Sequence, residues 1–242
     1  MSKRVVLIGI QARSTSERLP NKIHMRILGK SVLEHVIFAC VNTVKYLKRD
    51  CEKMNADLKL ALLVPEGDPA HALYKNQIPT LTGNEKDVLS RYVKAAKDLG
   101  ADYTVRITAD CIHHETHLIA KHIKTALIKE RDYTTNILHR TFKEGLDVEV
   151  VSKRLLEWLD ENAKSAEDRE HVTTLIGPGK PFPFLDEYSS PNIAHIIQKF
   201  DESKIKTSID TREDFDNSTA VLEGFEALKR SCMKNGIWIS WN

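Results

Sequence analysis

The first half of the chain alternates continuous apolar runs with segments whose apolar residues recur at helical spacing. The apolar runs are rich in β-branched residues and span positions 5–10, 58–64 and 103–108. Runs of this kind are typical of strands buried on both faces of a parallel sheet. Helical spacing predicts helices over 32–47, 87–99 and 116–129. Because strands alternate with helices, the pattern predicts an α/β fold whose mostly parallel sheet is flanked by helices.

The second half of the chain has a less regular pattern. It predicts strands over 147–151, 193–197 and 206–209, and an edge strand over 237–241. It also predicts helices over 153–162, 168–176 and from 211 to about 230, with a loop over 177–183. The mixture predicts a small mixed excursion added to the sheet. We expect one domain over residues 1–242.

Composition narrows the class of protein. The net charge is +2, with 36 Lys and Arg against 34 Asp and Glu, whereas general nucleic-acid binders carry a marked basic excess. The four cysteines show no metal-ligand spacing, and we expect them to be reduced. The apolar run at 5–10 is too short to cross a membrane and is followed by polar residues instead of a cleavage site. We therefore expect a soluble cytoplasmic protein with no nucleic-acid or membrane partner.

A basic loop follows the first predicted strand. Arg13, Arg18 and Lys22 lie in it, with hydroxyl donors at 14–16. Ligands bind at the carboxyl edge of open α/β sheets, so these groups are candidates to surround a triphosphate. A solvated loop with ordinary surface charges is the alternative that the composition leaves open. Neither Gly-x-Gly-x-x-Gly nor Gly-x-x-x-x-Gly-Lys-Ser/Thr occurs, which argues against a Rossmann dehydrogenase and a P-loop ATPase.

Two aspartates stand just beyond predicted strands. Asp110 follows the strand at 103–108, and Asp210 follows the short one at 206–209. A carboxylate there suits Mg²⁺, which takes one or two protein carboxylates together with phosphate oxygens. Asp110 alone is equally well explained as a helix N-cap or turn residue, and an aspartate placed as Asp210 is, alone, more often a turn residue. Their equivalent edge positions predict that they share one metal ion.

A third polar group follows later in the chain. Strand alternation places Asp147 and Glu149 on one face of the strand at 147–151, which predicts either an acceptor site or an exposed strand face. The histidine-rich stretch 113–117 reads His-His-Glu-Thr-His, whereas a zinc protease needs His-Glu-x-x-His. We therefore do not expect a zinc site there.

Six segments, in order, resemble one known family: the spore coat polysaccharide biosynthesis protein F type of cytidylyltransferase, a relative of the CMP-sialic acid and CMP-Kdo synthetases. The segments are Ile10-Gln11-Ala12-Arg13 with Arg18-Leu19-Pro20-x-Lys22, the Gly-x-x-x-Asp-Val-Leu-x-Arg-Tyr segment at 83–92, Val105-Arg106-Ile107-Thr108-x-Asp110-Cys111, Gly145-Leu146-Asp147-Val148-Glu149-Val150, Glu170-His171-Val172-Thr173, and Asp210-Thr211-x-Glu213-Asp214-Phe215. Each segment alone is weak, but six in the right order over nearly the whole chain are specific.

The resemblance implies a GT-A-like, Rossmann-type nucleotidyltransferase fold. It implies a nucleotide-binding part at about 1–135, an acceptor and dimer part at about 136–205, and a metal-site return with a C-terminal helix at 206–242. It implies Arg13 and Lys22 on the triphosphate, Asp110 and Asp210 on Mg²⁺, and a homodimer. The residues implied at the nucleotide are Gln11, Ala12, Arg13, Arg18, Lys22, Gly83, Asp87 and Arg106, and those expected at the acceptor are His113, Asp147, Glu149 and His171.

The chain also departs from the family pattern. Thr15 and Asn21 stand where the family usually has glycine, and Glu17 stands where it usually has threonine. After Cys111 the family usually continues Pro-Leu-Ile-Asp, but this chain has Ile-His-His-Glu at 112–115. Glycine allows the backbone to approach a phosphate closely, whereas a carboxylate repels the phosphate. These departures leave open which acceptor is used and whether the chain has kept its activity.

The expected reaction is therefore Mg²⁺-dependent transfer of CMP from CTP to a sugar or sugar-acid acceptor, with release of pyrophosphate, for surface polysaccharide or glycoconjugate synthesis. One alternative is a GT-A-fold glycosyltransferase that uses a nucleotide-sugar donor. That class would favour a tight Asp-x-Asp pair, whereas the carboxylate after Asp110 is delayed to Glu115. The other alternative is a non-catalytic nucleotide-binding relative, because fold alone is a poor guide to function.

Overall fold

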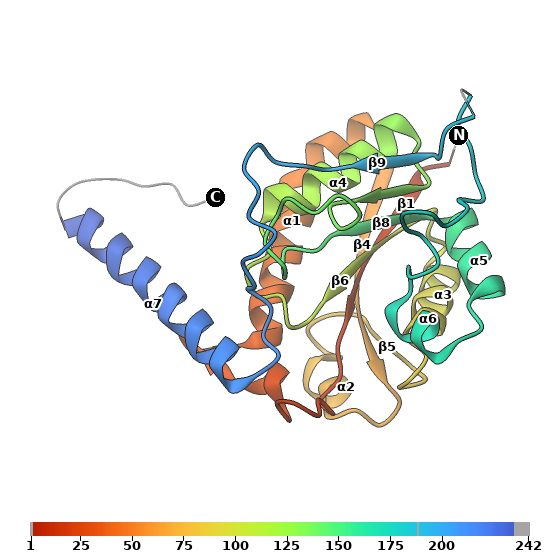
Figure 1. Ribbon diagram of the computed structural model, residues 1–242. Coiled ribbons are helices and arrows are strands. Elements are labelled where there is room, and N and C mark those ends of the chain that lie inside the picture. The colour runs from red at the N-terminus through yellow and green to blue at the C-terminus, as the bar shows by residue number, and fades with distance from the viewer. Residues whose placement is uncertain (1, 188, 235–242) are drawn as a thin grey trace.

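A seven-stranded mixed sheet forms the centre of the molecule (Figure 1). The computed structural model describes residues 2–187 and 189–234. The sheet order is β5-β4-β1-β6-β8-β7-β9. The strands are β1 (Arg4–Gln11), β4 (Ala56–Pro65), β5 (Thr80–Gly83), β6 (Tyr103–Thr108), β7 (Tyr133–Thr135), β8 (Glu149–Ser152) and β9 (Ile193–His195). Strand β8 runs antiparallel to both of its neighbours, and the other pairs are parallel. The predicted fold, a mostly parallel sheet with a mixed excursion in the second half, is confirmed.

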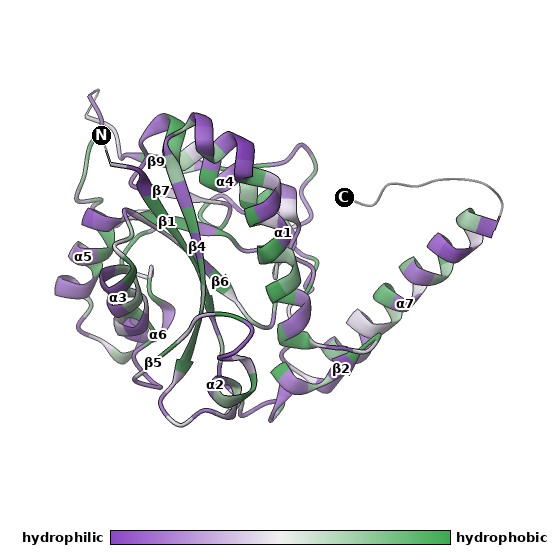
Figure 2. Ribbon diagram, turned by 180° about the vertical axis from the view of Figure 1, so that it is seen from behind, coloured by the Kyte–Doolittle hydropathy of each residue, from purple (hydrophilic) through white to green (hydrophobic). Residues whose placement is uncertain are grey.

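Helices cover both faces of this sheet. Helices α1 (Val32–Lys53) and α4 (Thr116–Lys129) lie on one face, and α3 (Val88–Leu99), α5 (Lys153–Asn162) and α6 (Ala166–His171) lie on the other (Figures 1 and 2). Alternating residues of β1 point into two separate cores: Ile8 and Ile10 into the first, Leu7 into the second. This alternation explains the continuous apolar run of β1, because both of its faces are buried.

A glycine lets α3 approach β1 closely. A Cβ on Gly9 would lie 2.6 Å from Cε1 of Tyr92, closer than real Cβ contacts. The Tyr92 hydroxyl, fully inside the second core, donates to the Gly9 carbonyl oxygen at 3.0 Å. The glycine therefore makes room for an aromatic ring that ties α3 to the central strand.

Several short elements complete the fold. They are the 3₁₀ helix η1 (Lys22–His24), the two-stranded sheet of β2 (Arg26–Ile27) and β3 (Lys30–Ser31), and helix α2 (Pro69–Tyr74). A capping box starts α1: the Ser31 hydroxyl accepts from the Glu34 N–H, and the Glu34 carboxylate accepts from the Ser31 N–H. No helix in the described part of the chain is long and apolar enough to span a membrane.

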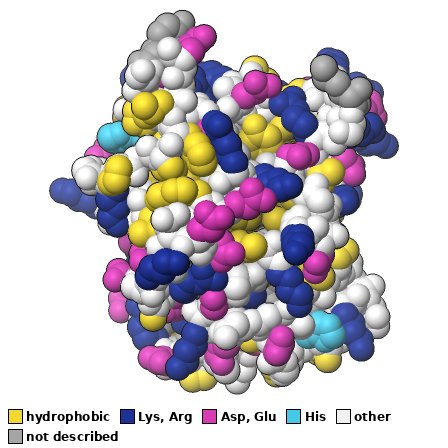
Figure 3. All heavy atoms as spheres, turned by 90° about the vertical axis from the view of Figure 1, so that its right-hand side faces the viewer, with side chains coloured by type: hydrophobic (Ala, Val, Ile, Leu, Met, Phe, Trp, Pro, Cys, Tyr) yellow, Lys and Arg dark blue, Asp and Glu magenta, His cyan; other side chains and the backbone are white. Residues whose placement is uncertain are grey.

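The C-terminal helix α7 (Arg212–Lys234) projects from the body of the molecule (Figures 1 and 2). Within it, Phe215 and Ser218 are the buried residues, and both lie in its first two turns. On the side of the molecule shown in Figure 3, basic and acidic side chains are interspersed instead of forming a surface of one sign.

The structure corrects several predicted elements. The helix expected over 168–176 ends at His171, because Val172 adopts a φ of 69° that no α-helix tolerates. The segment 206–209 is no strand of the sheet and makes a single bridge, from Lys206 to Glu144. The edge strand expected over 237–241 lies outside the described residues. Strands β5 and β7 are too short to give a clear sequence pattern.

Candidate active site

A cavity of about 650 Å³ lies at the carboxyl edge of the sheet. Strands β1 and β6 pair in parallel with Gln11 opposite Thr108, so the chain leaves both strands at the same edge. That edge is where ligands bind in open α/β sheets. The predicted residues that line the cavity are Gln11, Ala12, Arg13, Arg18, Lys22, Arg106, Asp110, His171 and Asp210.

The loop after β1 is held in place from within. The Ser14 N–H and hydroxyl donate to the two carboxylate oxygens of Asp68, each at 2.7 Å. The Thr15 hydroxyl donates to Glu85. Asn21 has a φ of 58°, the left-handed region that glycine enters freely and asparagine enters more easily than most residues. Asparagine at position 21 is therefore compatible with the backbone conformation that the loop adopts here.

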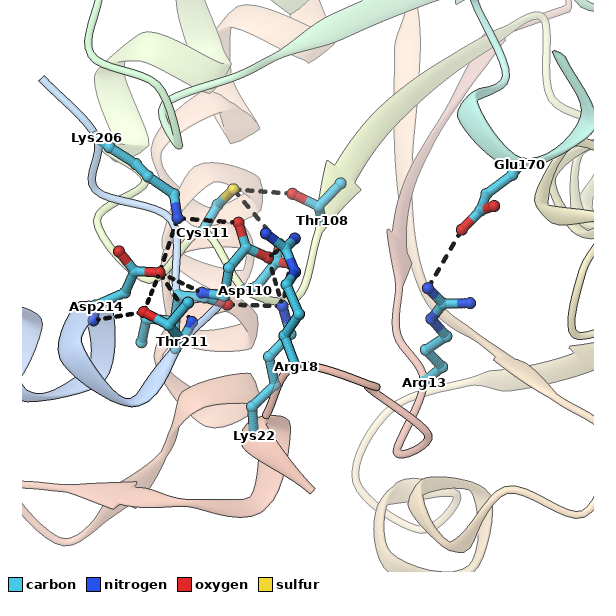
Figure 4. A network of polar contacts seen from close by, with 12 residues as sticks. Arg13, Arg18, Lys22, Thr108, Asp110, Cys111, Glu170, Lys206, Thr211 and Asp214 are labelled. Carbon is cyan, nitrogen blue, oxygen red and sulfur yellow. Dashed lines mark hydrogen bonds and ion pairs between the residues drawn. The ribbon is translucent and has the colours of Figure 1, made fainter. Parts of the chain in front are cut away.

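The ammonium of Lys22 joins the two aspartates (Figure 4). Its Nζ lies 2.7 Å from Asp110 Oδ2 and 3.2 Å from Asp210 Oδ1, and it donates to the Ile209 carbonyl oxygen at 2.6 Å. Asp110 comes from the end of β6 and Asp210 from the start of α7, so side chains 100 positions apart in the sequence converge on one cation. Lys22 is 8% exposed.

Two further cations surround Asp210. Arg18 Nη2 lies 2.8 Å from its Oδ1, and Lys206 Nζ lies 3.2 Å from its Oδ2. Burial acts to raise the pKa of Asp210, but the charge of Lys22 and hydrogen bonds from Lys206 and Lys22 outweigh it and hold that pKa below its usual range. Asp210 is therefore a carboxylate with an excess of positive charge around it.

Asp214 fixes the loop that carries Asp210. Its Oδ2 accepts from the backbone N–H groups of Asp210 at 3.0 Å and Thr211 at 2.8 Å, and from Lys206 Nζ at 2.7 Å. These bonds satisfy donors at the start of α7, as a helix cap does. Burial acts to raise the pKa of Asp214, but these donors outweigh it and lower the pKa to about 2.

Two arginines line the other side of the cavity. Arg13 lies apart from the group of charged side chains around Lys22 in Figure 4 and forms an ion pair with Glu170 of α6 at 3.2 Å. Arg91 of α3 is 4% exposed and donates to the carbonyl oxygens of Ala12 at 3.3 Å and Leu63 at 3.1 Å. Burial lowers the pKa of Arg91. A guanidinium held this way suits an anionic ligand.

A second, smaller recess of about 240 Å³ shares Arg106 and His171 with the cavity. Glu149 lines it at 1% exposure and accepts from Arg106 Nη1 at 2.5 Å, from Thr173 Oγ1 at 2.5 Å and from the Tyr133 hydroxyl. Burial acts to lower the pKa of Arg106, but the charge of Glu149 outweighs it and raises that pKa. Arg106 and Glu149 therefore form a buried ion pair in the wall between the two spaces.

Four predicted site residues lie outside both linings. Asp87 caps α3 through the Ser90 N–H at 2.9 Å and pairs with Arg169 at 2.7 Å. Asp147 lies before β8, not on it, and its carboxylate binds Arg140 at 2.5 and 3.0 Å. The remaining two are His113, whose Nε2 lies 3.2 Å from Ser218 Oγ, and Gly83, where a Cβ would lie 2.9 Å from Cγ of Arg91. Burial lowers the pKa of His113 to about 4.

The sequence analysis also missed residues at the site. Lys86, Arg91 and Glu170 line the cavity, and Lys206 and Asp214 hold Asp210. Arg91 and Glu170 belong to segments that carry the family resemblance, so a signal for them was present. Lys206 stands in a stretch predicted as a strand, and nothing in the sequence pattern connects it with Asp210.

The donor set around Lys22 is one that a hard cation prefers. Oxygens from Asp110, Asp210 and the Ile209 backbone already converge within 2.6–3.2 Å of one positive atom, and carboxylate and carbonyl oxygens are Mg²⁺ ligands. No group of three or more His, Cys, Asp or Glu side chains within residues 2–187 and 189–234 forms a ready cluster for a metal. The residues present therefore fit an ion that takes two carboxylates and completes its shell elsewhere.

Comparisons with solved structures identify the fold. The chain superimposes on a cytidylyltransferase from Leptospira borgpetersenii with a TM-score of 0.73 and 24% identity, over 99% of this chain and 100% of the other. It superimposes on a CMP:2-keto-3-deoxy-manno-octonic acid synthetase complexed with CTP with a TM-score of 0.62 and 11% identity, over 92% and 99% of the two chains. Rv0371c of Mycobacterium tuberculosis, in complex with manganese, matches with a TM-score of 0.56 and 11% identity over 90% and 99%.

A comparison of sequences identifies a relative. No family model matches the chain. The uncharacterized protein MJ1063 of Methanocaldococcus jannaschii is 32% identical over 219 residues, which cover 86% of this chain and 80% of the relative. The chain has the α/β fold of nucleotidyltransferases, as in cytidylyltransferases related to CMP-Kdo synthetase, and it belongs to the same protein family as MJ1063.

Proposed function

We propose that this chain is an Mg²⁺-dependent cytidylyltransferase of the spore coat polysaccharide biosynthesis protein F type. It transfers CMP from CTP to a sugar or sugar-acid acceptor and releases pyrophosphate, in surface polysaccharide or glycoconjugate synthesis. One observation carries the proposal: Asp110 and Asp210 meet beside Lys22 and Arg18 in a cavity at the carboxyl edge of β1 and β6. Carboxylates for a metal and cations for phosphates are thus side by side.

The cations of the cavity are proposed to bind the triphosphate. Arg13, Arg18 and Lys22 all line it, and their present partners are carboxylates that an anionic ligand can replace. We place the base near Gln11 and Ala12, and near the segment from Gly83 to Asp87. Lys86 and Val88 in the lining support this placement for the segment, while the Asp87 side chain itself is engaged by Arg169.

Asp110 and Asp210 are the residues that would hold Mg²⁺. When bound, the ion supplies charge neutralisation and orientation at the α-phosphate. The protein's share of the chemistry is positioning and electrostatics. An acceptor oxygen attacks the α-phosphorus, a new P–O bond forms, and the bond to the bridging oxygen of pyrophosphate breaks. A hydroxyl acceptor loses its proton to water, while Arg13, Arg18 and Lys22 stabilise the negative charge of the departing pyrophosphate.

The second recess is the proposed acceptor site. Glu149 and His171 line it, and His171 and Arg106 also face the nucleotide cavity, so an acceptor there would lie beside the α-phosphate. His113 and Asp147 gain no support from the geometry, because each is engaged outside the two linings. The division into a nucleotide part at 1–135, an acceptor part at 136–205 and a metal-site return from 206 remains part of the proposal, as does a homodimer.

A pyrophosphate-release screen tests the proposed function. Four nucleoside triphosphates are tried against a panel of acidic and phosphorylated sugars, and we expect release with CTP and Mg²⁺. Asp110→Ala or Asp210→Ala should reduce the rate at least about 100-fold, the scale on which lost electrostatic stabilisation acts. Asp147→Ala is the matched control and should keep most of the activity. Unchanged turnover in either of the first two variants would contradict the metal assignment.

One observation favours a non-catalytic relative. Glu17 lines the cavity and adds a carboxylate where phosphates are proposed to lie. Calorimetry with CTP and Mg²⁺ separates the two functions, since a non-catalytic relative binds without releasing pyrophosphate with any acceptor. Replacing Glu17 by threonine should then raise CTP affinity in either case, because a repulsive charge is removed.

A further inference from the structure

The position of Lys22 is unusual for a residue expected to bind phosphate. Its side chain is buried and lies between two carboxylates, and its Nζ is 2.7 Å from Asp110 Oδ2 and 3.2 Å from Asp210 Oδ1. A third acceptor, the Ile209 carbonyl oxygen, lies at 2.6 Å. An ammonium has three donors, so these three oxygens satisfy it completely.

The same three oxygens are the ones that a divalent cation would use. Carboxylate and carbonyl oxygens that converge on one point form the ligand set that Mg²⁺ and Mn²⁺ prefer. An ammonium and a divalent ion cannot share that point, because like charges at such a distance repel strongly. Lys22 and the metal therefore compete for one position.

We infer that Lys22 acts as a resident counter-ion that occupies the metal position until nucleotide and divalent ion bind together. The inference rests on the proposed function only in that Asp110 and Asp210 are the metal ligands. It adds that the free chain binds metal weakly and that metal and nucleotide binding depend on each other. The triphosphate supplies new acceptors for the displaced ammonium, since Lys22 lines the same cavity.

The neighbouring cations do not have this role. Arg18 is largely exposed and contacts Asp210 alone, and Lys206 contacts Asp210 Oδ2 and Asp214. Among the ion pairs of the described residues, Lys22 is the one side chain that bridges Asp110 and Asp210. Removing Lys22 therefore frees both carboxylates, whereas removing another cavity cation changes the net charge without freeing the pair.

Mn²⁺ binding without nucleotide tests the inference. Free Mn²⁺ is measured by electron paramagnetic resonance as protein is added. Lys22→Met keeps an unbranched side chain but no charge, and it should bind Mn²⁺ at least about tenfold more tightly than the unchanged chain, a usual strength of coupling between ligands. Lys86→Met removes a cation from the same cavity and should change affinity much less. Adding Asp110→Asn to Lys22→Met should abolish the gain.

Equal Mn²⁺ affinity in Lys22→Met and in the unchanged chain would overturn the inference. A second measurement uses the unchanged chain, so it does not depend on how the variant folds. Saturating Mn²⁺ should increase the rate at which an amine-reactive reagent labels Lys22, with Lys86 as the internal reference in mass spectrometry. A labelling rate that stays constant while Mn²⁺ binds would also overturn it. Both readouts are independent of pyrophosphate release, so failure of the proposed reaction would be recognised separately.

Discussion

At the scale of single residues, the candidate site is defined by unequal numbers of opposite charges. The Asp210 carboxylate has Arg18, Lys22 and Lys206 within 3.2 Å. These cations are shared with Asp110 and Asp214, but the cavity lining as a whole has six Lys and Arg against four Asp and Glu, an excess as large as the net charge of +2 of the whole chain. A cleft with such a field attracts anions and accelerates their association.

The contribution of Asp214 to stability should appear in the pH dependence of the unfolding free energy. Asp214→Asn removes a charge-assisted hydrogen bond to Lys206 and should cost about 1–3 kcal/mol of unfolding free energy near neutral pH. The folded-state pKa is lowered from its usual range to about 2, so the stabilisation is complete above about pH 4 and is lost as pH falls through 2. Urea unfolding of both proteins at successively lower pH checks this. A difference that stays constant or grows on acidification would contradict it.

Glu149 should matter far more to stability than an exposed carboxylate. Glu149→Gln leaves Arg106 as an uncompensated buried charge, and loss of one partner of a buried pair costs about 3–5 kcal/mol. The control is Glu170→Gln, whose pair with Arg13 is about half exposed on both sides and should contribute less than about 1 kcal/mol. Denaturant unfolding compares the two variants. Equal losses would show that the Arg106–Glu149 pair is not shielded from water.

Residue chemistry was predictable from the sequence where a strand carries the residue to the sheet edge. Gln11 and Asp110 end or follow buried strands, so the apolar pattern placed them at one edge of the sheet, whereas Arg106 lies inside β6 and was expected only from the family resemblance. Asp147, placed by strand alternation, and His113, expected at the acceptor, are instead engaged outside the cavity by Arg140 and Ser218. Such pairings depend on side-chain geometry that periodicity does not contain.

At the scale of elements, a close approach of two backbone segments that run side by side helps to set the position of Asp210. Gly145 has a φ of 98°, and a Cβ there would lie 2.5 Å from the backbone nitrogen of Ser208. The Glu144 carbonyl oxygen accepts from the Thr207 N–H at 2.7 Å. The segment that ends in Asp210 is therefore in direct backbone contact with the segment that leads into β8. This close approach gives a physical reason for glycine in the fourth of the family segments.

Gly145→Ala should disturb the site and the fold together. The added methyl group meets main chain that cannot move aside cheaply, and the positive φ adds strain, so we expect a loss of at least about 1–3 kcal/mol of unfolding free energy. We also expect weaker Mn²⁺ binding in the presence of CTP. Gly179→Ala is the matched control, because its φ is 75° with nothing within 4 Å of the added Cβ. Similar losses of unfolding free energy in the two variants would show that the strain of a positive φ, and not the close approach of Gly145 to Ser208, causes the loss.

Elements with a strong period were predictable, and elements made by tertiary contacts were not. Helix α4 and strand β6 match their predicted bounds because their apolar patterns are long or continuous. Val172 and Ile176 imitate a helical pattern beyond His171, yet they are buried in a turn that packs into the second core. The segment 206–209 reads as a strand but forms one isolated bridge, from Lys206 to Glu144, instead of joining the sheet.

At the scale of the whole molecule, helix α7 extends away from the body that contains both cores. Val221 and Leu228 lie seven positions apart, on the same face of the helix, and each is about half exposed. Helices without tertiary packing are marginal in water, so most of their stability comes from an apolar face that is covered. The exposed stripe supports the proposed homodimer, in which a second copy of the chain would cover α7.

Leu228→Glu should therefore shift the proposed dimer toward the monomer. A charge inside an apolar interface loses its hydration, whereas the same charge at exposed Ala227, about 100° around the helix from Leu228, keeps more of it. Ala227→Glu is the matched control with an equal change of charge. Sedimentation velocity at several concentrations measures the mass of each protein. A dimer of unchanged stability in Leu228→Glu, or a monomer in the unchanged chain, would contradict this use of α7.

The contact between Lys22 and Asp210 spans 188 positions of the sequence, which has a consequence for how the protein is made. Translation proceeds from the N-terminus, so Lys22 and Asp110 leave the ribosome well before Asp210 has been polymerised. A product terminated before residue 210 contains Lys22 and Asp110 but lacks Asp210. The pair of carboxylates around Lys22 is thus completed only when residue 210 has been added, long after its two partners.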